Sequence, residues 1–341
     1  MNYKKTGKKI LSCALSIIII LSMLTPQIPV SAKSSGKSDK TIDLQILATS
    51  DLHGRFVSYE YASNEATDSG SLAQVATAVK EQRKQNPNTI LVDNGDTIQD
   101  NSSELFLKDK EHPMIAGMNE LKYDTWTLGN HEFNYLPVLK PILKQSKATV
   151  LCGNVYQPDG RPLGADYKII NRNGVKVALI GMVTPNIVKW DEQNLKGYKV
   201  TDPVAETKEV IKKLKGKADL FIGVVHMGVD PEYGVSNSGV TELAKKVPEL
   251  TAIIAGHAHS KIPSQTINGV LVTEPGFAGQ ALSKIVISLK KSSSGYKVVS
   301  KNSELILMND TKTGKVYEQD KKLVKKMETA NHQRGSSDRT Q

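Results

Sequence analysis

From about residue 41 onward the chain alternates between short apolar runs and longer amphipathic stretches. The apolar runs have the length and β-branched content of buried strands, and they lie at 42–48, 89–92, 125–128, 149–152, 219–225 and 252–255. Stretches with apolar residues at helical spacing separate them, near 71–84, 113–121, 135–145 and 203–215. Such alternation of strand and helix predicts an α/β fold.

Two later segments break this rhythm. A hairpin is expected over 166–183 with its turn at Asn173-Gly174, because that dipeptide favours tight turns between strands. Residues 261–307 indicate short antiparallel strands, with a second hairpin around Asn268-Gly269. We expect a lysine-rich helix from about 315 to 330, followed by a polar tail over 334–338.

The first 32 residues have a different pattern. Lysines at positions 4, 5, 8 and 9 precede the apolar run Ile10–Leu24, and Val30-Ser31-Ala32 offers a small-residue cleavage site. This order is typical of a secretory signal peptide, and the run is too short to span a membrane comfortably. We therefore expect a secreted protein without a transmembrane segment in its mature chain.

The pattern predicts four parts. They are a signal peptide over 1–32, a flexible leader over 33–40, a main domain over 41–310, and a linker-like helix with a polar tail over 311–341. Cys152 is the single cysteine after residue 32, so no disulfide can form within the mature chain.

Charge narrows the choice of partners only slightly. The formal net charge of +10 is compatible with an anionic substrate, with retention at an anionic cell wall, or simply with a soluble basic surface. No cluster combines aromatic and basic residues as single-stranded nucleic acids require, so a nucleic-acid polymer is not an expected partner. We expect a monomer that acts on a small molecule.

Side chains of the metal-ligand type follow five of the apolar runs, and these segments contain five of the seven histidines. The candidate ligands are Asp51, His53, Asp96, Asn130, His226, His257 and His259. Strand ends gather at one crevice in α/β sheets, so these distant residues are expected to meet. Carboxylates, an amide and imidazoles without a thiolate suit a pair of divalent cations better than one structural zinc.

The spacing suggests a role for each residue. Asp96, on its Gly95 turn, is the best candidate for a carboxylate that bridges two cations. Two cations lower the pKa of a bridging water toward neutrality, and the hydroxide so formed attacks phosphorus in line. His131, next to Asn130, would contact the phosphoryl group or protonate the leaving oxygen.

Each motif alone has an ordinary structural explanation. A single Asp-x-His commonly caps a turn, and a single Gly-Asp commonly forms one; only the conjunction of all five segments argues for a metal centre. His112 and His332 lie outside these segments and are expected at the surface. Tyr59, Tyr61 and Tyr233 are candidates for stacking on a base, although loop tyrosines usually bind nothing specific.

The motifs resemble those of the calcineurin-like metallophosphoesterase superfamily. Within it they are similar to the 5′-nucleotidase family, which includes bacterial 2′,3′-cyclic-nucleotide 2′-phosphodiesterases with 3′-nucleotidase activity. The resemblance covers roughly 41–330 and rests on the stretches 46–54, 91–96, 128–135 and 255–259.

This resemblance implies a four-layer α/β/β/α sandwich and two divalent metal ions, with Mn, Zn, Fe or Co all compatible with the ligands. It implies one ion at Asp51, His53, Asp96 and His259, and the other at Asp96, Asn130, His226 and His257. It also implies that His131 is the catalytic histidine and that Asn130 and His131 bind substrate.

Two departures from the family pattern matter. Asn134 stands where many 5′-nucleotidases have an aspartate beside the catalytic histidine, and this favours the cyclic-phosphodiesterase branch. By the resemblance Asn134 is a catalytic residue with His131, because its amide would still orient the imidazole. Relatives normally continue into a carboxyl-terminal nucleotidase domain whose aromatic residues stack on the base. The chain stops after the helix that would lead there, so we expect nucleotide selectivity and affinity to fall.

Three hypotheses follow. The leading one is a secreted dinuclear-metal phosphoesterase acting on 2′,3′-cyclic nucleotides and 3′-nucleotides. The second is a 5′-nucleotidase or nucleotide-sugar hydrolase. The third is a truncated, inactive protein that binds metal or nucleotide without turnover.

Overall fold

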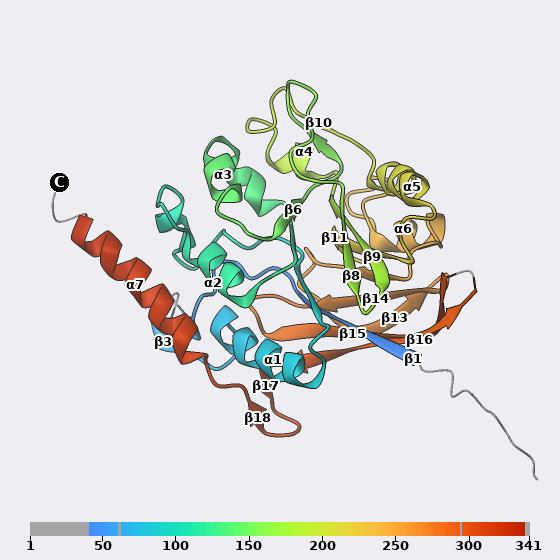
Figure 1. The fold of residues 1–341 in the computed structure, drawn as a ribbon. Helices are drawn as coiled ribbons and strands as arrows, with labels where there is room; N and C mark the ends of the chain where they lie inside the picture. The colour runs from blue at the N-terminus through green and yellow to red at the C-terminus, as the bar shows by residue number, and fades with distance from the viewer. Residues whose placement is uncertain (1–40, 61–62, 294, 338–341) are drawn as a thin grey trace, which may run out of the picture. The chain divides into compact units, whose positions relative to one another are not determined.

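A computed structural model describes residues 41–60, 63–293 and 295–337, and Figure 1 shows its ribbon. The expected signal peptide and leader, over 1–40, lie outside the described residues. Within the described ranges, no helix combines the length and apolar character needed to cross a membrane.

The first of two six-stranded sheets carries three of the predicted motifs. Its strand order is β16-β15-β1-β4-β5-β6. Four of its strands run parallel, namely β1 (Thr41–Thr49), β4 (Ile90–Asp93), β5 (Thr125–Thr127) and β6 (Thr149–Leu151). The antiparallel strands β15 (Ala281–Ser292) and β16 (Gly295–Leu307) complete it.

The second sheet carries the other two motifs and has the order β13-β14-β12-β11-β9-β8. Its parallel centre consists of β9 (Val175–Val183), β11 (Leu220–His226), β12 (Ala252–Ile254) and β14 (Val270–Pro275). The antiparallel edges are β8 (Tyr167–Arg172) and β13 (Lys261–Ile267).

Helices cover the outer face of each sheet. The first sheet is covered by α1 (Leu72–Gln85), α2 (Pro113–Leu121), α3 (Leu136–Leu143) and α7 (Lys321–Ser337). The second is covered by α5 (Pro203–Leu214) and α6 (Val240–Lys246). Short elements complete the fold: β2 (Tyr59–Glu60), β3 (Glu65–Ala66), η1 (Ser103–Phe106), η2 (His131–Tyr135), β7 (Val155–Tyr156), α4 (Ile187–Trp190), β10 (Lys199–Val200), β17 (Asn309–Asp310) and β18 (Lys315–Val316).

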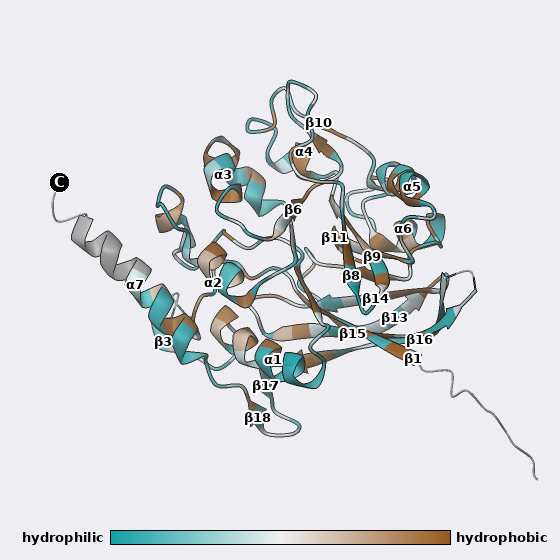
Figure 2. Ribbon diagram, in the orientation of Figure 1, coloured by the Kyte–Doolittle hydropathy of each residue, from teal (hydrophilic) through white to brown (hydrophobic). Residues whose placement is uncertain are grey.

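Three separate apolar clusters lie between these layers, one between the sheets and one under each group of helices. Alternation along β1 illustrates the arrangement: Ile46 and Ala48 face the other sheet, whereas Leu47 faces the helices. Figure 2 shows brown, hydrophobic segments on strands such as β1 and β15 and on parts of the helices that cover the sheets. The predicted four-layer α/β/β/α sandwich is therefore confirmed.

Local sequence signals explain where elements begin and turn. The side chain of Ser71 accepts a hydrogen bond from Gln74 N and caps α1, and Asp202 caps α5 in the same way, with Pro203 as its first residue. The β8–β9 hairpin turns at Asn173-Gly174, where both residues have positive φ, as a type I′ turn requires.

Two expectations about the carboxyl-terminal third were wrong. β15 and β16 are long, with 12 and 13 residues, and β14 pairs in parallel with β12. The sequence predicted only short strands because β16 is an edge strand with many polar residues in contact with solvent, so its apolar pattern is weak.

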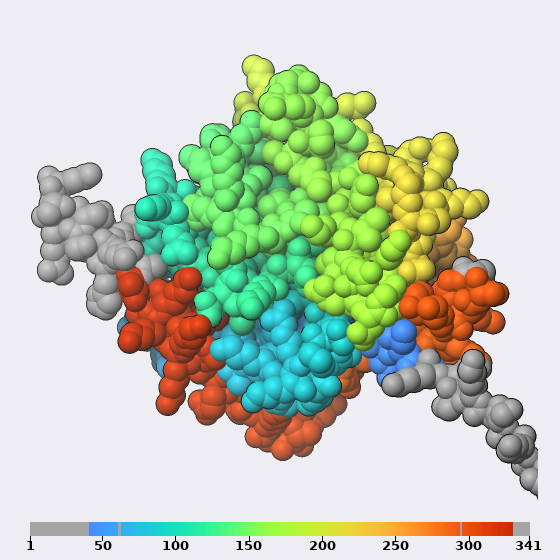
Figure 3. All heavy atoms as spheres, in the orientation of Figure 1, coloured from blue at the N-terminus to red at the C-terminus, as the bar shows by residue number. Residues whose placement is uncertain are grey.

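The last helix also begins later than expected, because residues 315–316 pair with 309–310 and Asp320 caps the helix at Leu323 N. It continues through the residues expected to form a polar tail, to Ser337. Leu323 and Met327 join the core under α1 and α2, and Figure 3 shows this segment against the same helices. The division at residue 310 stays a prediction.

Candidate metal centre

The candidate ligands lie at the carboxyl ends of strands from both sheets. Asp51 and His53 follow β1, Asp96 follows β4, and Asn130 follows β5; His226 ends β11, and His257 and His259 follow β12. The Nδ2 group of Asn94 donates to the carbonyl oxygens of Val225 at 3.0 Å and Ile254 at 3.3 Å. This buried amide connects the first sheet to the second beside the ligands.

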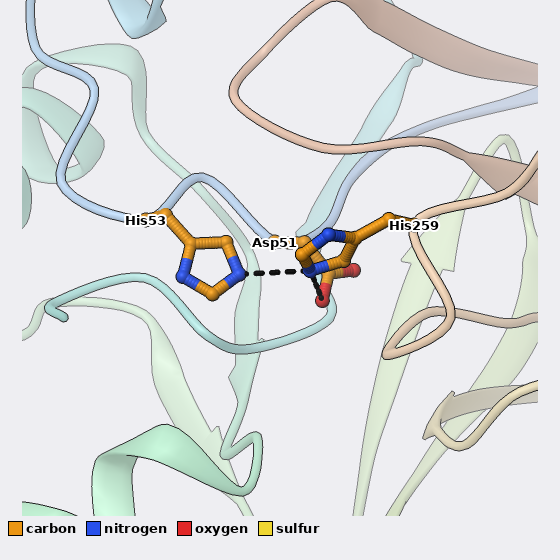
Figure 4. Close-up of side chains that lie close together, drawn as sticks. All are labelled: Asp51, His53 and His259. Carbon is orange, nitrogen blue, oxygen red and sulfur yellow. Dashed lines mark hydrogen bonds and ion pairs between the residues drawn. The ribbon is translucent and has the colours of Figure 1, made fainter. Parts of the chain in front are cut away.

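One group of ligands, here called the open cluster, consists of Asp51, His53 and His259. The Nε2 atoms of His53 and His259 are 3.0 Å apart, and His259 Nε2 lies 3.5 Å from Asp51 Oδ1. Figure 4 shows both imidazoles pointing inward over the carboxylate. Asp51 is fully buried, whereas 40% of the His259 side chain is exposed.

The second group, here called the buried cluster, consists of Asp96, His226 and His257. His226 Nε2 lies 3.1 Å from Asp96 Oδ2. The amide oxygen of Asn130 lies 3.0 Å from His226 Nε2 and 2.7 Å from His257 Nδ1, so it joins this cluster as a neutral oxygen.

Asp96 stands between the two clusters. Its Oδ2 atom is 3.1 Å from His226 Nε2 and 4.0 Å from His53 Nε2. Within each cluster the ligand atoms lie within 4.8 Å of one another. One carboxylate and two imidazoles in each cluster are a donor set that fits a divalent cation. The structure thus holds two candidate His/Asp metal sites, and the assignment of individual ligands stays a prediction.

Three of the candidate ligand imidazoles are held from behind by an oxygen acceptor. The pairs are His53 Nδ1 with Gln99 Oε1 at 2.8 Å, His226 Nδ1 with the carbonyl of Asn94 at 2.6 Å, and His257 Nε2 with Glu232 Oε2 at 3.0 Å. With a cation bound, each outer nitrogen would donate its proton to that oxygen and the inner nitrogen would present a lone pair to the cation.

The backbone of the ligand loops is strained. Left-handed φ angles of 53°, 46°, 53°, 71° and 56° occur at Asp51, His53, Asp96, His257 and His259. Non-glycine residues rarely adopt this conformation, and each costs on the order of 1–3 kcal/mol. Such strain concentrates where the surrounding structure positions functional side chains.

A buried carboxylate that the sequence did not single out shapes the Asp96 loop. Glu132 accepts hydrogen bonds from the backbone N–H groups of Asp96 at 2.9 Å, Thr97 at 2.7 Å and Gly129 at 2.7 Å. Gly129 is required beside it, because a Cβ atom there would collide with Asp96. Burial raises the pKa of Glu132, and the nearby Asp96 adds to the shift.

Charge is balanced inside the buried cluster. Burial opposes charge on His226, but the carboxylates of Asp96 and Asp51 outweigh it and raise the pKa of His226 to about 10. Burial likewise disfavours the Asp96 anion, but His226 outweighs it and lowers the pKa of Asp96 below its usual value.

His131 lies at the edge of the clusters within a chain of hydrogen bonds. Its backbone N–H donates to Asp96 Oδ1 at 2.8 Å, and its Nδ1 atom lies 2.8 Å from Asn134 Oδ1. Asn134 Nδ2 in turn donates to Asp191 Oδ1 at 2.9 Å, which fixes the orientation of the amide. An aspartate at position 134 would face the Asp191 carboxylate, so an amide suits this site.

The remaining candidates have different outcomes. His112 was expected at the surface but is fully buried, because it precedes α2 and packs against Phe106. Tyr233 is 69% exposed and packs on Trp190, and the Tyr59 hydroxyl donates to Asn64. Tyr61 and the side chain of His332 lie outside the described residues.

The chain is similar to known phosphoesterases in sequence. The family model named calcineurin-like phosphoesterase matches residues 44–261. The chain is 36% identical over 335 residues to the trifunctional nucleotide phosphoesterase protein YfkN of Bacillus subtilis, covering 87% of this chain and 23% of the relative. It is 31% identical over 349 residues to a 2′,3′-cyclic-nucleotide 2′-phosphodiesterase/3′-nucleotidase of Yersinia enterocolitica, covering 92% of this chain and 53% of the relative.

Among solved structures, a crystal structure of the calcineurin-like phosphoesterase YfkN from Bacillus subtilis matches with a TM-score of 0.78 and 33% sequence identity. That match covers 86% of this chain and 98% of the other. The chain spans about a quarter and about half of the two full-length relatives.

Proposed function

Because the chain belongs to the calcineurin-like phosphoesterase family, in its 5′-nucleotidase and 2′,3′-cyclic-nucleotide phosphodiesterase branch, we propose that it hydrolyses 2′,3′-cyclic nucleotides and 3′-nucleotides. The observation that carries the proposal is the pair of ligand clusters around Asp96, with the hydrogen-bonded His131 beside them.

The metals and the protein would divide the chemistry. The open and buried clusters would each hold one divalent cation, and such a pair would supply an activated water and neutralise charge on phosphate oxygens. Asn130 turns its amide oxygen toward His226 and His257, which leaves its Nδ2 group to donate to a phosphate oxygen. This chain's own residues thus orient the phosphate for in-line attack.

His131 would handle the leaving group. Asn134 Oδ1 accepts from the Nδ1–H group of His131, so in the imidazolium form the Nε2–H group would deliver a proton to the leaving oxygen and His131 would become neutral. In a 2′,3′-cyclic nucleotide, a new P–O bond forms from water, the P–O2′ bond breaks, and O2′ takes the proton. The product is a 3′-nucleotide, whose P–O3′ bond can be cleaved by the same residues.

The first test is hydrolysis of bis(p-nitrophenyl) phosphate by residues 33–341, with and without Mn²⁺. This substrate has no nucleobase, so it tests the metal centre alone. Metal-dependent turnover is expected in the wild type and should disappear in Asp96→Ala. A folded, metal-loaded protein without turnover would contradict the proposal and support the inactive alternative.

Substrate preference needs a second comparison. 2′,3′-Cyclic AMP, 3′-AMP and 5′-AMP should be hydrolysed in that order of kcat/KM. The name of the relative from Yersinia enterocolitica supports activity on the first two substrates, and Asn134 supports the cyclic-phosphodiesterase branch through the resemblance. Faster hydrolysis of 5′-AMP would instead select the 5′-nucleotidase alternative.

We also propose that the protein is secreted. The lysines and apolar run of residues 1–32 support export with cleavage after Ala32. Amino-terminal sequencing of protein from the culture medium should begin at Lys33; an intact Met1 inside cells would contradict export.

A further inference from the structure

A pocket of about 720 Å³ lies beside the open cluster. Its wall includes His53 and His259 of that cluster together with the candidate proton donor His131. The volume falls in the usual range of small-molecule sites. It is much larger than a phosphate group requires, so it has room for the rest of a substrate.

The proposed chemistry determines which part of a substrate enters this pocket. In a nucleotide the group that departs from phosphorus is the nucleoside. The residue that protonates it must lie on its side of the phosphate. Because His131 is part of the pocket wall, the nucleoside is expected there.

One aromatic ring is presented to that space. Phe277 lies parallel to the His259 imidazole, with ring centroids 4.8 Å apart and an interplanar angle of 9°, and 36% of the residue remains exposed. Among the exposed large apolar side chains of the described residues, it alone lines this pocket. An exposed aromatic face is the usual platform for a nucleobase.

The backbone around Phe277 is fastened to both loops of the open cluster. Ala278 N donates to the carbonyl of Asp51 at 2.7 Å, and Gly276 N donates to the carbonyl of Ser260 at 3.0 Å. A ring fixed in this way is ready to bind before the substrate arrives, which reduces the entropic cost of binding.

Polar residues form much of the remaining pocket wall. Asp100, Asn101 and Ser102 form three consecutive left-handed residues, and Asn101 Nδ2 donates to the carbonyl of His53 at 2.7 Å. Arg55 also lines the pocket, held by Glu60 at 2.8 Å. Hydroxyl, amide, guanidinium and carboxylate groups in the same pocket as an aromatic ring offer donors and acceptors to the hydroxyls of a ribose attached to a planar base.

We propose that Phe277 is the stacking surface for the nucleobase, and that this domain holds a nucleoside subsite of its own. The inference rests on the proposed function, because it places a nucleoside as the leaving group. Two other exposed aromatic residues, Trp190 and Tyr233, lie on the His257 side and do not line this pocket. Lys189 Nζ already lies over the Tyr233 ring, 5.0 Å from its centroid.

The test compares substrates that share a five-membered cyclic phosphate but differ in the base. 2′,3′-Cyclic AMP carries a nucleobase, whereas glycerol 1,2-cyclic phosphate carries none. Phe277→Ala should raise KM for the nucleotide by about tenfold with kcat little changed, since stacking contributes equally to ground and transition states. KM for the glycerol ester should not change, and Phe277→Tyr should restore nucleotide binding.

Tyr233→Ala is the matched control, because it removes an exposed aromatic ring on the other side of the centre. It should leave both KM values unchanged. Metal content is measured in every variant, because Phe277 contacts His259. The subsite is refuted if Phe277→Ala affects both substrates equally or if Tyr233→Ala has the same effect.

A measurement on the wild type separates this inference from the proposed function. Adenosine should inhibit hydrolysis of the nucleotide competitively. Turnover of both cyclic esters with equal KM and no inhibition by adenosine would refute the subsite while leaving a working phosphoesterase. Turnover of neither ester by metal-loaded protein would instead refute the proposed function.

Discussion

The open and buried clusters use the same ligand types in different surroundings. The side chains of Asp96 and His226 are 1% and 0% exposed, whereas that of His259 is 40% exposed and borders the pocket. Burial favours a cation that stays in place, while exposure allows exchange and contact with substrate. The difference suggests that the buried cluster maintains the centre and the open cluster meets the phosphate.

The largest effect is expected at Asp96, which lies between the two clusters. Asp96→Asn should lower kcat for bis(p-nitrophenyl) phosphate by roughly 10³-fold or more, because Asp96 is the proposed bridging ligand and charge stabilisation by both cations would depend on it. Elemental analysis should show loss of metal from both sites. Asp230→Asn removes an exposed carboxylate outside the clusters and should change neither kcat nor metal content. Full metal content in Asp96→Asn would contradict a role for Asp96 as a ligand of both cations.

The next largest effect is a difference in metal rescue between a variant of the open cluster and a variant of the buried cluster. His259→Ala opens one exposed position, so excess Mn²⁺ should restore much of its activity. His226→Ala leaves Asp96 and Asp51 buried without their cationic partner and should both destabilise the fold and resist rescue. Thermal unfolding and activity are followed during Mn²⁺ titration. Equal rescue of the two variants would show that burial does not distinguish the sites.

A smaller effect concerns the residue beside the clusters. His131→Ala should lower kcat for 2′,3′-cyclic AMP by about 10²–10⁴-fold, because the alkoxide leaving group needs a proton. The effect on bis(p-nitrophenyl) phosphate should be much smaller, since p-nitrophenolate leaves without protonation. Equal losses on both substrates would show that His131 positions the phosphate and transfers no proton.

The smallest effect is a change in the pH dependence of stability, and it follows from the contrast between two buried histidines. Aspartates raise the pKa of His226 to about 10, whereas burial, opposed only in part by the Ser103 backbone, lowers the pKa of His112 to about 4. Folded His112 therefore binds fewer protons than unfolded His112 between pH 4 and 6.5, and its contribution to stability falls as pH falls through that window.

Urea unfolding of the wild type and His112→Phe should test this. Within that window the wild type should lose up to about 1.4 kcal/mol per pH unit more than the variant. The variant keeps a ring against Phe106, and activity at pH 7.5 should not change. Identical pH dependence in both proteins would rule out His112 as the titrating group.

The sequence predicted the positions of functional residues well where these residues directly follow a strand with a clear apolar pattern. Ligands such as Asp51 and His257 follow apolar strands, so their positions in the chain already indicated a common location. Glu232, Gln99 and Asp191 could not be found in this way, because they lie in loops without a periodic pattern and act through contacts made only after folding. Burial of His112 was missed for a similar reason, since its packing against Phe106 arises only when η1 and the start of α2 come together in the fold.

The amide of Asn94 has a consequence for the whole domain. Because it ties the two sheets together where the ligands converge, the sheets cannot separate there without dismantling the centre. Cations bound by ligands from both sheets should therefore hold the two sheets together. The free energy of cation binding should add to the stability of the whole domain, so that both sheets unfold cooperatively. Amide hydrogens along β11 and β12 should exchange more slowly once metal is bound, even though most of those residues touch no ion.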